Sequence, residues 1–280
     1  MKRVTLILSL IVLVILPNEL FPQGNLVIIG GGSRPDYVMD TFIELAGGKD
    51  SRIIIFPTAS YDPLDAGEFY VREFTERGVE NVDFIICTRE TADTEENFEL
   101  LKGATGVFFS GGDQNRHTAA LLGTQLLDKV KQIYNDGGVI GGTSAGAAVM
   151  SKVMITGDEY LAGEDDEPFS IIKKGNIVTA EGFGFLDKVI IDQHFVERKR
   201  HNRLMSLVLE NPELVGLGIS ESTSLLVDPE KKFQVLGEGT VVVYDARESD
   251  KIEVDENRNL SAQNIILHIM QSGDIFTLNQ

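Results

Sequence analysis

The chain has 280 residues, which suffices for one α/β domain of about 200 to 250 residues and makes a second full domain improbable. Its formal net charge of -18 argues against nucleic acid as a partner. Cys87 is the single cysteine, so no intrachain disulfide can form. Composition thus indicates an acidic globular domain whose function must be sought in local motifs.

The first residues are typical of an export signal. Lys2 and Arg3 give a positively charged start, and residues 4–16 form an almost unbroken apolar run. This run suits the apolar part of a signal peptide better than a membrane span, which needs about 20 residues. We therefore expect residues 1–23 to be a signal peptide for export to the periplasm or outside the cell, with an uncleaved anchor as the alternative. Residues 24–280 would form the single folded domain.

Short apolar runs alternate with amphipathic stretches through the first half of this domain. The runs predict buried strands at residues 26–29, 52–57, 82–87, 106–109 and 139–142. Apolar residues at three- and four-residue spacing predict helices at 37–46, 65–77, 94–101 and 118–135. This order predicts an α/β fold with a doubly wound, mostly parallel sheet, in which ligands bind beyond the carboxyl ends of the strands.

The second half is less regular. We expect an acidic surface loop at residues 164–167, a strand at 189–191 and a helix at 196–209. Two C-terminal β-hairpins are expected, one at residues 225–245 that turns at 228–232 and one at 265–278 that closes the fold.

Residues 142–146 read Gly-Thr-Ser-Ala-Gly and lie between a predicted strand and a predicted helix. Small residues let the backbone bend sharply there and expose the hydroxyl of Ser144. The helix that follows would add backbone N–H donors for a developing oxyanion. The pattern therefore predicts Ser144 as a nucleophile.

A serine nucleophile needs a base, and the chain offers four histidines. His194 follows the strand at 189–191 and lies at the sheet edge where Ser144 is expected. His117 lies in a polar stretch, His201 within the predicted helix and His268 in a late strand. Location favours His194.

Two carboxylates could orient this imidazole. Glu221 ends a short apolar run, and Asp192 lies two residues before His194, on the same face of a strand. Spacing alone leaves both open. With Glu221, the chain order is serine, histidine, acid, which differs from the serine, acid, histidine order of α/β-hydrolases and argues against an ordinary esterase.

Four motifs together resemble those of the cyanophycinases, serine exopeptidases related to the aspartyl dipeptidases. The motifs, in chain order, are Gly111-Gly112-Asp113-Gln114, Gly142-Thr143-Ser144-Ala145-Gly146-Ala147, Asp192-Gln193-His194-Phe195 followed by Arg198, Arg200 and Arg203, and Gly218-Ile219-Ser220-Glu221. The similarity implies the flavodoxin-like fold of class I glutamine amidotransferases. Ser220, Ser222 and the turn at residues 30–35 depart from the family pattern, which bears on the substrate rather than on the catalytic residues.

The resemblance implies a triad of Ser144, His194 and Glu221, and an oxyanion hole made by the backbone N–H groups of Gly112 and Ala145. It assigns substrate recognition to Gln114, Asp192, Arg198, Arg200 and Arg203. It further implies a homodimer that needs no metal or cofactor and cleaves cyanophycin, multi-L-arginyl-poly-L-aspartate, into β-Asp-Arg dipeptides.

Three other functions are consistent with parts of the sequence. An aspartyl or isoaspartyl dipeptidase would need the same triad with a smaller site. A binding module on the same fold without catalysis is a rival of another class, since fold does not fix function. A phosphate-binding loop at Gly30-Gly31-Gly32 is disfavoured, because the stretch lacks a full GxGxxG pattern.

Overall fold

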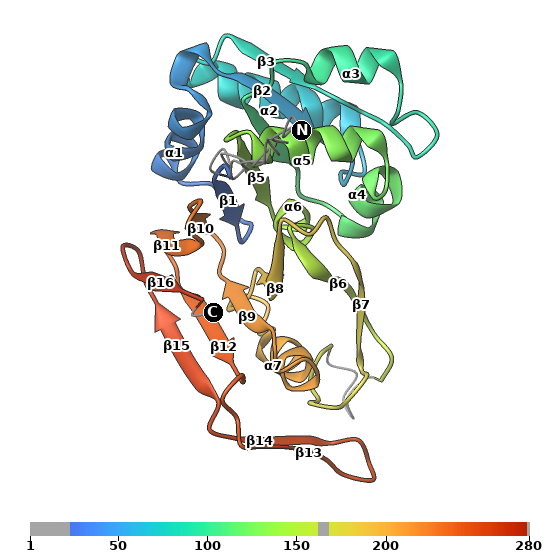
Figure 1. Ribbon diagram of the computed structural model, residues 1–280, viewed down its shortest axis with the longest axis vertical. Coiled ribbons are helices and arrows are strands. Elements are labelled where there is room, and N and C mark those ends of the chain that lie inside the picture. Colours follow the sequence, from blue (N-terminus) through green and yellow to red (C-terminus); the bar gives the residue numbers. More distant parts are fainter. Residues whose placement is uncertain (1–22, 162–167, 279–280) are drawn as a thin grey trace, which may run out of the picture.

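The computed structural model describes residues 23–161 and 168–278. The predicted acidic loop and all but the last residue of the predicted signal segment lie outside these ranges. The described chain forms two large sheets, one above the other in Figure 1. No helix in the described ranges has both the length and the apolar character needed to cross a membrane.

The first sheet has eight strands, and five adjacent strands that extend to one edge of it are parallel, as the sequence predicted. In spatial order the strands are β16 (Ile275–Thr277), β11 (Lys232–Gly237), β10 (Thr223–Val227), β1 (Leu26–Ile29), β5 (Val139–Thr143), β4 (Gly106–Phe109), β2 (Arg52–Phe56) and β3 (Asn81–Phe84). β1, β2, β4 and β5 are almost wholly buried, as expected for parallel strands that helices cover on both faces.

Helices cover both faces of this sheet. α1 (Asp36–Ala46) and α2 (Pro63–Glu76) pack on one face, and a short 3-10 turn, Gly48–Asp50, follows α1. The other face is covered by α3 (Glu95–Leu101), α4 (Gln114–Leu121) and α5 (Gln125–Asn135). The helix predicted at 118–135 is therefore two helices. Gly123 has a φ of +73°, and the Thr124 hydroxyl starts the second helix by accepting the Leu127 N–H.

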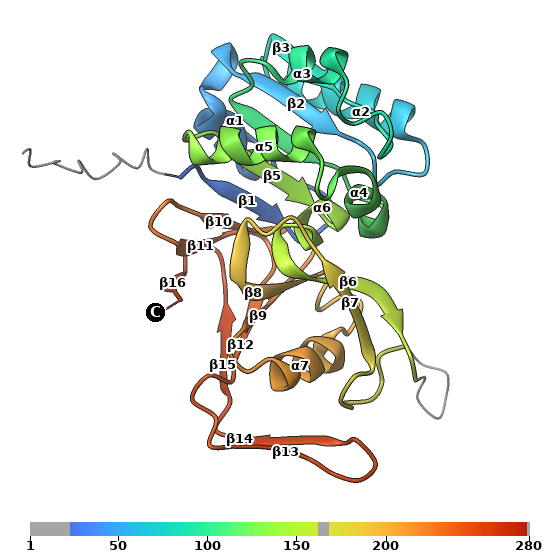
Figure 2. The same cartoon turned by 45° about the vertical axis from the view of Figure 1, so that its right-hand side comes forward.

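The second sheet has six strands and packs against the face of the first sheet that α3 to α5 also cover. Its order is β15 (Ile266–Met270), β12 (Val241–Asp245), β9 (Val215–Ile219), β8 (Leu186–Gln193), β6 (Ser151–Glu159) and β7 (Ile177–Glu181). The short helix α6 (Ala145–Ala148) connects the sheets, and α7 (His201–Glu210) packs on the outer face, as Figure 2 shows. β13 (Lys251–Val254) and β14 (Leu260–Gln263) form a separate hairpin.

The C-terminal strands differ from the two predicted hairpins. β10 and β11 do form a hairpin, but β12 belongs to the second sheet. β15 pairs with β12 and β16 with β11, so residues 265–278 link the sheets instead of folding back on themselves. The alternation of apolar residues indicates where strands lie but not which strands pair with each other. The predicted pairing of the C-terminal strands was therefore wrong.

Candidate active site

Ser144 occupies a sharp turn between β5 and α6. Its φ of 53° and ψ of -109° are strained for a residue with a side chain. Gly142 and Gly146 make the bend feasible, because a Cβ on Gly142 would come within 2.5 Å of the Gly146 carbonyl oxygen. The turn therefore presents the serine hydroxyl beyond the end of the strand, as the motif predicted.

The Ser144 hydroxyl, His194 and Glu221 form a continuous chain of hydrogen bonds. Ser144 Oγ lies 2.8 Å from His194 Nε2, and His194 Nδ1 lies 2.5 Å from Glu221 Oε1. An ionised carboxylate only accepts, so Nδ1 carries the proton and Nε2 is left to accept from the serine. His194 follows β8 and Glu221 follows β9, its parallel neighbour.

Three consecutive carbonyls at the end of β1 hold the backbones of these residues. The oxygen of Ile29 accepts the Ser144 N–H at 3.0 Å, and that of Gly30 accepts the His194 N–H at 2.7 Å. The oxygen of Gly31 accepts the N–H of Ser222, the residue after Glu221, at 2.9 Å. The end of β1 thus fixes the relative positions of all three side chains.

The glycines after β1 leave room for the histidine and the acid. A Cβ on Gly31 would lie 2.3 Å from His194 Cε1, and one on Gly32 would lie 2.7 Å from Glu221 Cβ. Both glycines also have positive φ, +105° and +69°. The run that resembled a phosphate loop therefore packs against the hydrogen-bonded chain. The sequence motifs did not predict this role, although the three adjacent glycines were its signal.

The two backbone amides predicted to form an oxyanion hole are free of partners in the described chain. Neither the Gly112 N–H nor the Ala145 N–H donates a hydrogen bond to any described residue. The loop that carries Gly112 lies against the serine, since a Cβ on Gly111 would be 3.5 Å from Ser144 Cβ. α6 has only four residues, so the amides themselves, rather than a long helix dipole, are available to an oxyanion.

Burial lowers the pKa of His194 below its ordinary value of 6.5, and the hydrogen bond to Glu221 opposes part of that effect. The positive charges of Arg198 and Arg200 lower this pKa further. At neutral pH the imidazole is therefore neutral, which is the state that can accept the proton of Ser144. The arrangement can carry out base-assisted nucleophilic attack.

A cationic cavity of about 580 Å³ includes Arg198 and Arg200, whose charges act on this histidine. It is lined by Pro168, Phe169, Ser170, Arg198, Lys199, Arg200 and Asn202. Arg198 is exposed, whereas Arg200 is held by the carbonyl oxygen and the side-chain oxygen of Gln193, at 2.7 and 2.8 Å. Burial lowers the pKa of Arg200 to about 10, so it stays charged near neutral pH.

Arg203 does not belong to an exposed clamp. The predicted helix at 196–209 begins only at His201, because His194 and Lys199 adopt positive φ and the chain turns tightly between them. Arg203 consequently points inward, is 1% exposed and is ion-paired with the equally buried Asp192. This pair also removes Asp192 as a candidate for orienting His194.

Gln114, also expected at the substrate, is largely committed to the fold. Its Nε2 donates to the carbonyl oxygens of Ile155 and Thr156 at 2.8 and 2.6 Å, which ties α4 to β6. Its Oε1 accepts no hydrogen bond from the described residues, so contact with substrate stays a prediction. Across residues 23–161 and 168–278, no three His, Cys, Asp or Glu side chains form a group suited to a metal ion.

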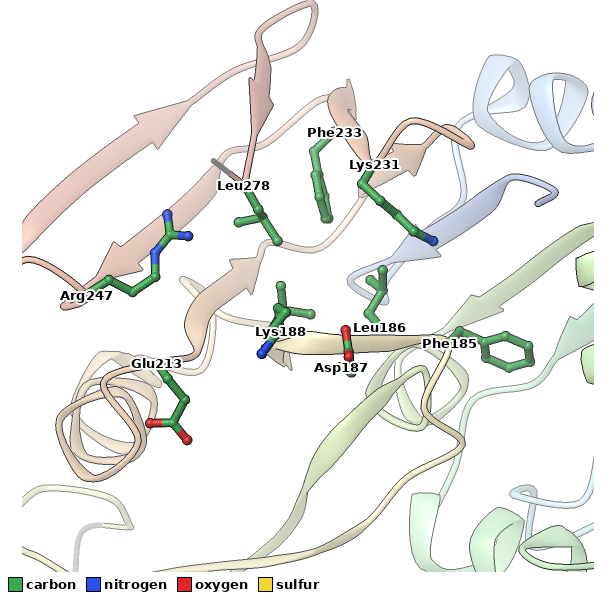
Figure 3. Close-up of a pocket in the computed structure, with 10 residues that line it drawn as sticks. Phe185, Leu186, Asp187, Lys188, Glu213, Lys231, Phe233, Arg247 and Leu278 are labelled. Atoms are coloured by element: carbon green, nitrogen blue, oxygen red, sulfur yellow. The ribbon is translucent and has the colours of Figure 1, made fainter. Parts of the chain in front are cut away.

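The other three histidines have different surroundings. His117 is fully buried in α4, His201 Nδ1 lies 2.8 Å from the Tyr244 hydroxyl, and His268 is exposed on β15. A further cavity, of about 540 Å³, opens at the start of β8, the end opposite His194 (Figure 3). Its walls include Phe185, Phe233 and Leu278, and it has no residue in common with the hydrogen-bonded chain.

The chain is similar to several known proteins. The sequence is 36% identical over 264 residues to a cyanophycinase of Synechococcus elongatus, covering 91% of this chain and 80% of the relative. It is 35% identical over 262 residues to a cyanophycinase of Trichormus variabilis, covering 91% and 85%. The crystal structure of a peptidase from an acI-B1 Actinobacterium superimposes with a TM-score of 0.66 over 92% of this chain and 98% of the other, at 23% identity, and so shares the fold. Because the model of Peptidase family S51 also matches residues 26–235, three quarters of the sequence, the chain belongs to peptidase family S51.

Proposed function

We propose that this peptidase cleaves peptides with an aspartate backbone through an acyl-enzyme, and that cyanophycin is its substrate. The hydrogen-bonded chain from Ser144 through His194 to Glu221 carries the chemical part of this proposal. The relatives named as cyanophycinases, which match nine tenths of this chain, support the choice of substrate.

In the proposed mechanism, Ser144 Oγ attacks the peptide carbonyl carbon while His194 Nε2 takes the hydroxyl proton. The amides of Gly112 and Ala145 would stabilise the resulting oxyanion, and Glu221 would stabilise the imidazolium. His194 then gives the proton to the leaving amine as the C–N bond breaks. Water, activated by the same imidazole, releases the acyl group and restores the serine.

The cationic cavity supports an acidic substrate. Arg198, Lys199 and Arg200 line this cavity in a chain whose formal net charge is -18. Poly-aspartate would be repelled by most of this surface, so a local cationic group is needed to bind its carboxylates. Removing one such contact should lower kcat/KM by roughly ten- to a hundredfold. Arg200→Ala should have this effect on aspartate-backbone peptides.

The test is digestion of purified cyanophycin, beside α- and β-aspartyl dipeptides, by the wild-type protein and by Ser144→Ala. The variant should fold normally, since it loses only the hydroxyl of one half-buried side chain, but it should release no dipeptide and should not react with a fluorophosphonate. Substantial turnover by folded Ser144→Ala would refute the mechanism. Cleavage of dipeptides without cleavage of the polymer would instead indicate an aspartyl dipeptidase.

A second pair of variants tests the orienting acid. Glu221→Gln should lower kcat by roughly ten thousandfold, by analogy with other triads, because the imidazole loses the carboxylate that fixes its tautomer. Asp192→Asn should act on stability instead, since Asp192 pairs with Arg203. If Asp192→Asn alone abolished kcat in a folded protein, the two roles would be reversed.

We also propose that residues 1–23 direct export and that the mature protein is a homodimer. The charged start and the apolar run at residues 4–16 support the first proposal. Family resemblance supports the second. N-terminal sequencing of the exported protein and light scattering of the purified protein would test them separately.

A further inference from the structure

Glu197 contacts the residue that orients the proposed base. Its Oε2 accepts the backbone N–H of Glu221 at 3.0 Å. Glu197 itself lies three residues after His194, in a tight turn closed by the Arg198 N–H, which donates to the His194 carbonyl oxygen at 3.0 Å. One side chain thus connects the turn that carries the histidine to the strand end that carries the acid.

The peptide units around Glu221 are held from several directions. Its carbonyl oxygen accepts from Thr223 Oγ1 at 2.9 Å, and the N–H of Ser222 donates to Gly31 as described above. The Glu221 side chain is 35% exposed, so packing alone does not fix it. Its N–H is the group that Glu197 restrains, and losing this bond would let the carboxylate shift relative to His194.

Glu197 serves the backbone of Glu221 as a hydrogen-bond acceptor. Its negative charge strengthens this bond, but a neutral oxygen in the same place can also accept the N–H. We propose that Glu197 is a positioning residue, which holds the backbone of Glu221 so that its carboxylate meets His194 Nδ1. This inference rests on the proposed function, in which that contact serves catalysis.

Three variants of the full chain separate the alternatives. Glu197→Ala removes the acceptor, whereas Glu197→Gln keeps an oxygen that can accept the same N–H without the charge. Glu213→Ala is the matched control, because Glu213 is an exposed glutamate just before β9, at the end of that strand opposite Glu221 (Figure 3). Far-UV circular dichroism and Tm would establish that all three fold.

For Glu197→Ala we expect kcat to fall roughly tenfold with KM changed less than about twofold, since one hydrogen bond to a charged group is lost. The acid limb of the kcat profile should move to lower pH, because a loosened Glu221 raises the pKa of His194 less. Glu197→Gln should recover most of kcat and the wild-type profile, and Glu213→Ala should match the wild type.

Fluorophosphonate labelling at Ser144 distinguishes failure of this inference from failure of the proposed function. Labelling needs an activated serine but no peptide, so Glu197→Ala should label more slowly even if no tested peptide is cleaved. Wild-type rates of labelling and cleavage in Glu197→Ala would overturn the positioning role. The positioning role would also be refuted if Glu197→Gln were as slow as Glu197→Ala, or if KM rose only for arginine-bearing substrates. Either result would show that the negative charge of Glu197 matters, and not its role as a hydrogen-bond acceptor.

Discussion

The imidazole of His117 is fully buried in α4, and its protonation should lower the stability of this protein as the pH falls. The ring packs edge-on against Phe109 and Phe183, and Nε2 lies 3.0 Å from the Ser110 carbonyl oxygen. A carbonyl only accepts, so Nε2 carries the proton, while Nδ1 has no partner among the described residues. Burial lowers the pKa of His117 from 6.5 to about 4.

The sign of the effect follows from the depressed pKa. In the unfolded chain this imidazole titrates near its ordinary pKa of 6.5, so between pH 6.5 and about pH 4 the unfolded state binds a proton that the native state does not. The neutral ring therefore contributes its full stabilisation of the native state above pH 6.5, and this stabilisation is lost as the pH falls. The loss reaches about 2 kcal/mol at about pH 5 and about 3 kcal/mol below pH 4.

His117→Gln isolates this contribution, because its amide nitrogen can still donate to Ser110 but cannot titrate. The chain has no tryptophan, so urea unfolding is best followed by far-UV circular dichroism, at about pH 7.5 and about pH 5. Between these conditions the wild type should lose about 2 kcal/mol more unfolding free energy than the variant, since all other groups contribute equally to both. Equal losses in the two proteins would refute the reasoning.

Three further outcomes are expected. The acid limb of kcat/KM should lie below pH 6.5, and Arg198→Ala should move it to higher pH, because the Arg198 charge lowers the pKa of His194; an unchanged limb would contradict this electrostatic effect. Gly31→Ala should lower kcat roughly a hundredfold, because its Cβ would displace the His194 ring, and near-normal kcat would show that the ring can relocate. Asp192→Asn should reduce the free energy of unfolding by about 3 to 5 kcal/mol, measured by urea titration, because Arg203 would remain buried without its ion pair; a loss below about 1 kcal/mol would argue against that pairing.

Local sequence was sufficient for the parallel half of the fold and for the position of the serine. Apolar runs such as residues 26–29 and 139–142 are short, continuous and followed by glycine, which suits buried parallel strands whose ends form a site. His194 and Glu221 each come just after a short apolar run, which predicted that they lie beyond the carboxyl ends of two strands. In the structure these strands are β8 and β9. These features depend on neighbours along the chain, so the sequence alone could specify them.

The choice between Asp192 and Glu221 depended on tertiary structure. Residues two apart in the chain share a face only within a strand. The φ of +48° at His194 ends the strand conformation there, so this relation no longer holds for Asp192 and His194. The histidine then meets an acid from the neighbouring strand, while Asp192 turns to Arg203, eleven residues later. Which strands share a sheet, and which charges are buried, depends on contacts between distant segments, and no local pattern in the sequence encodes them.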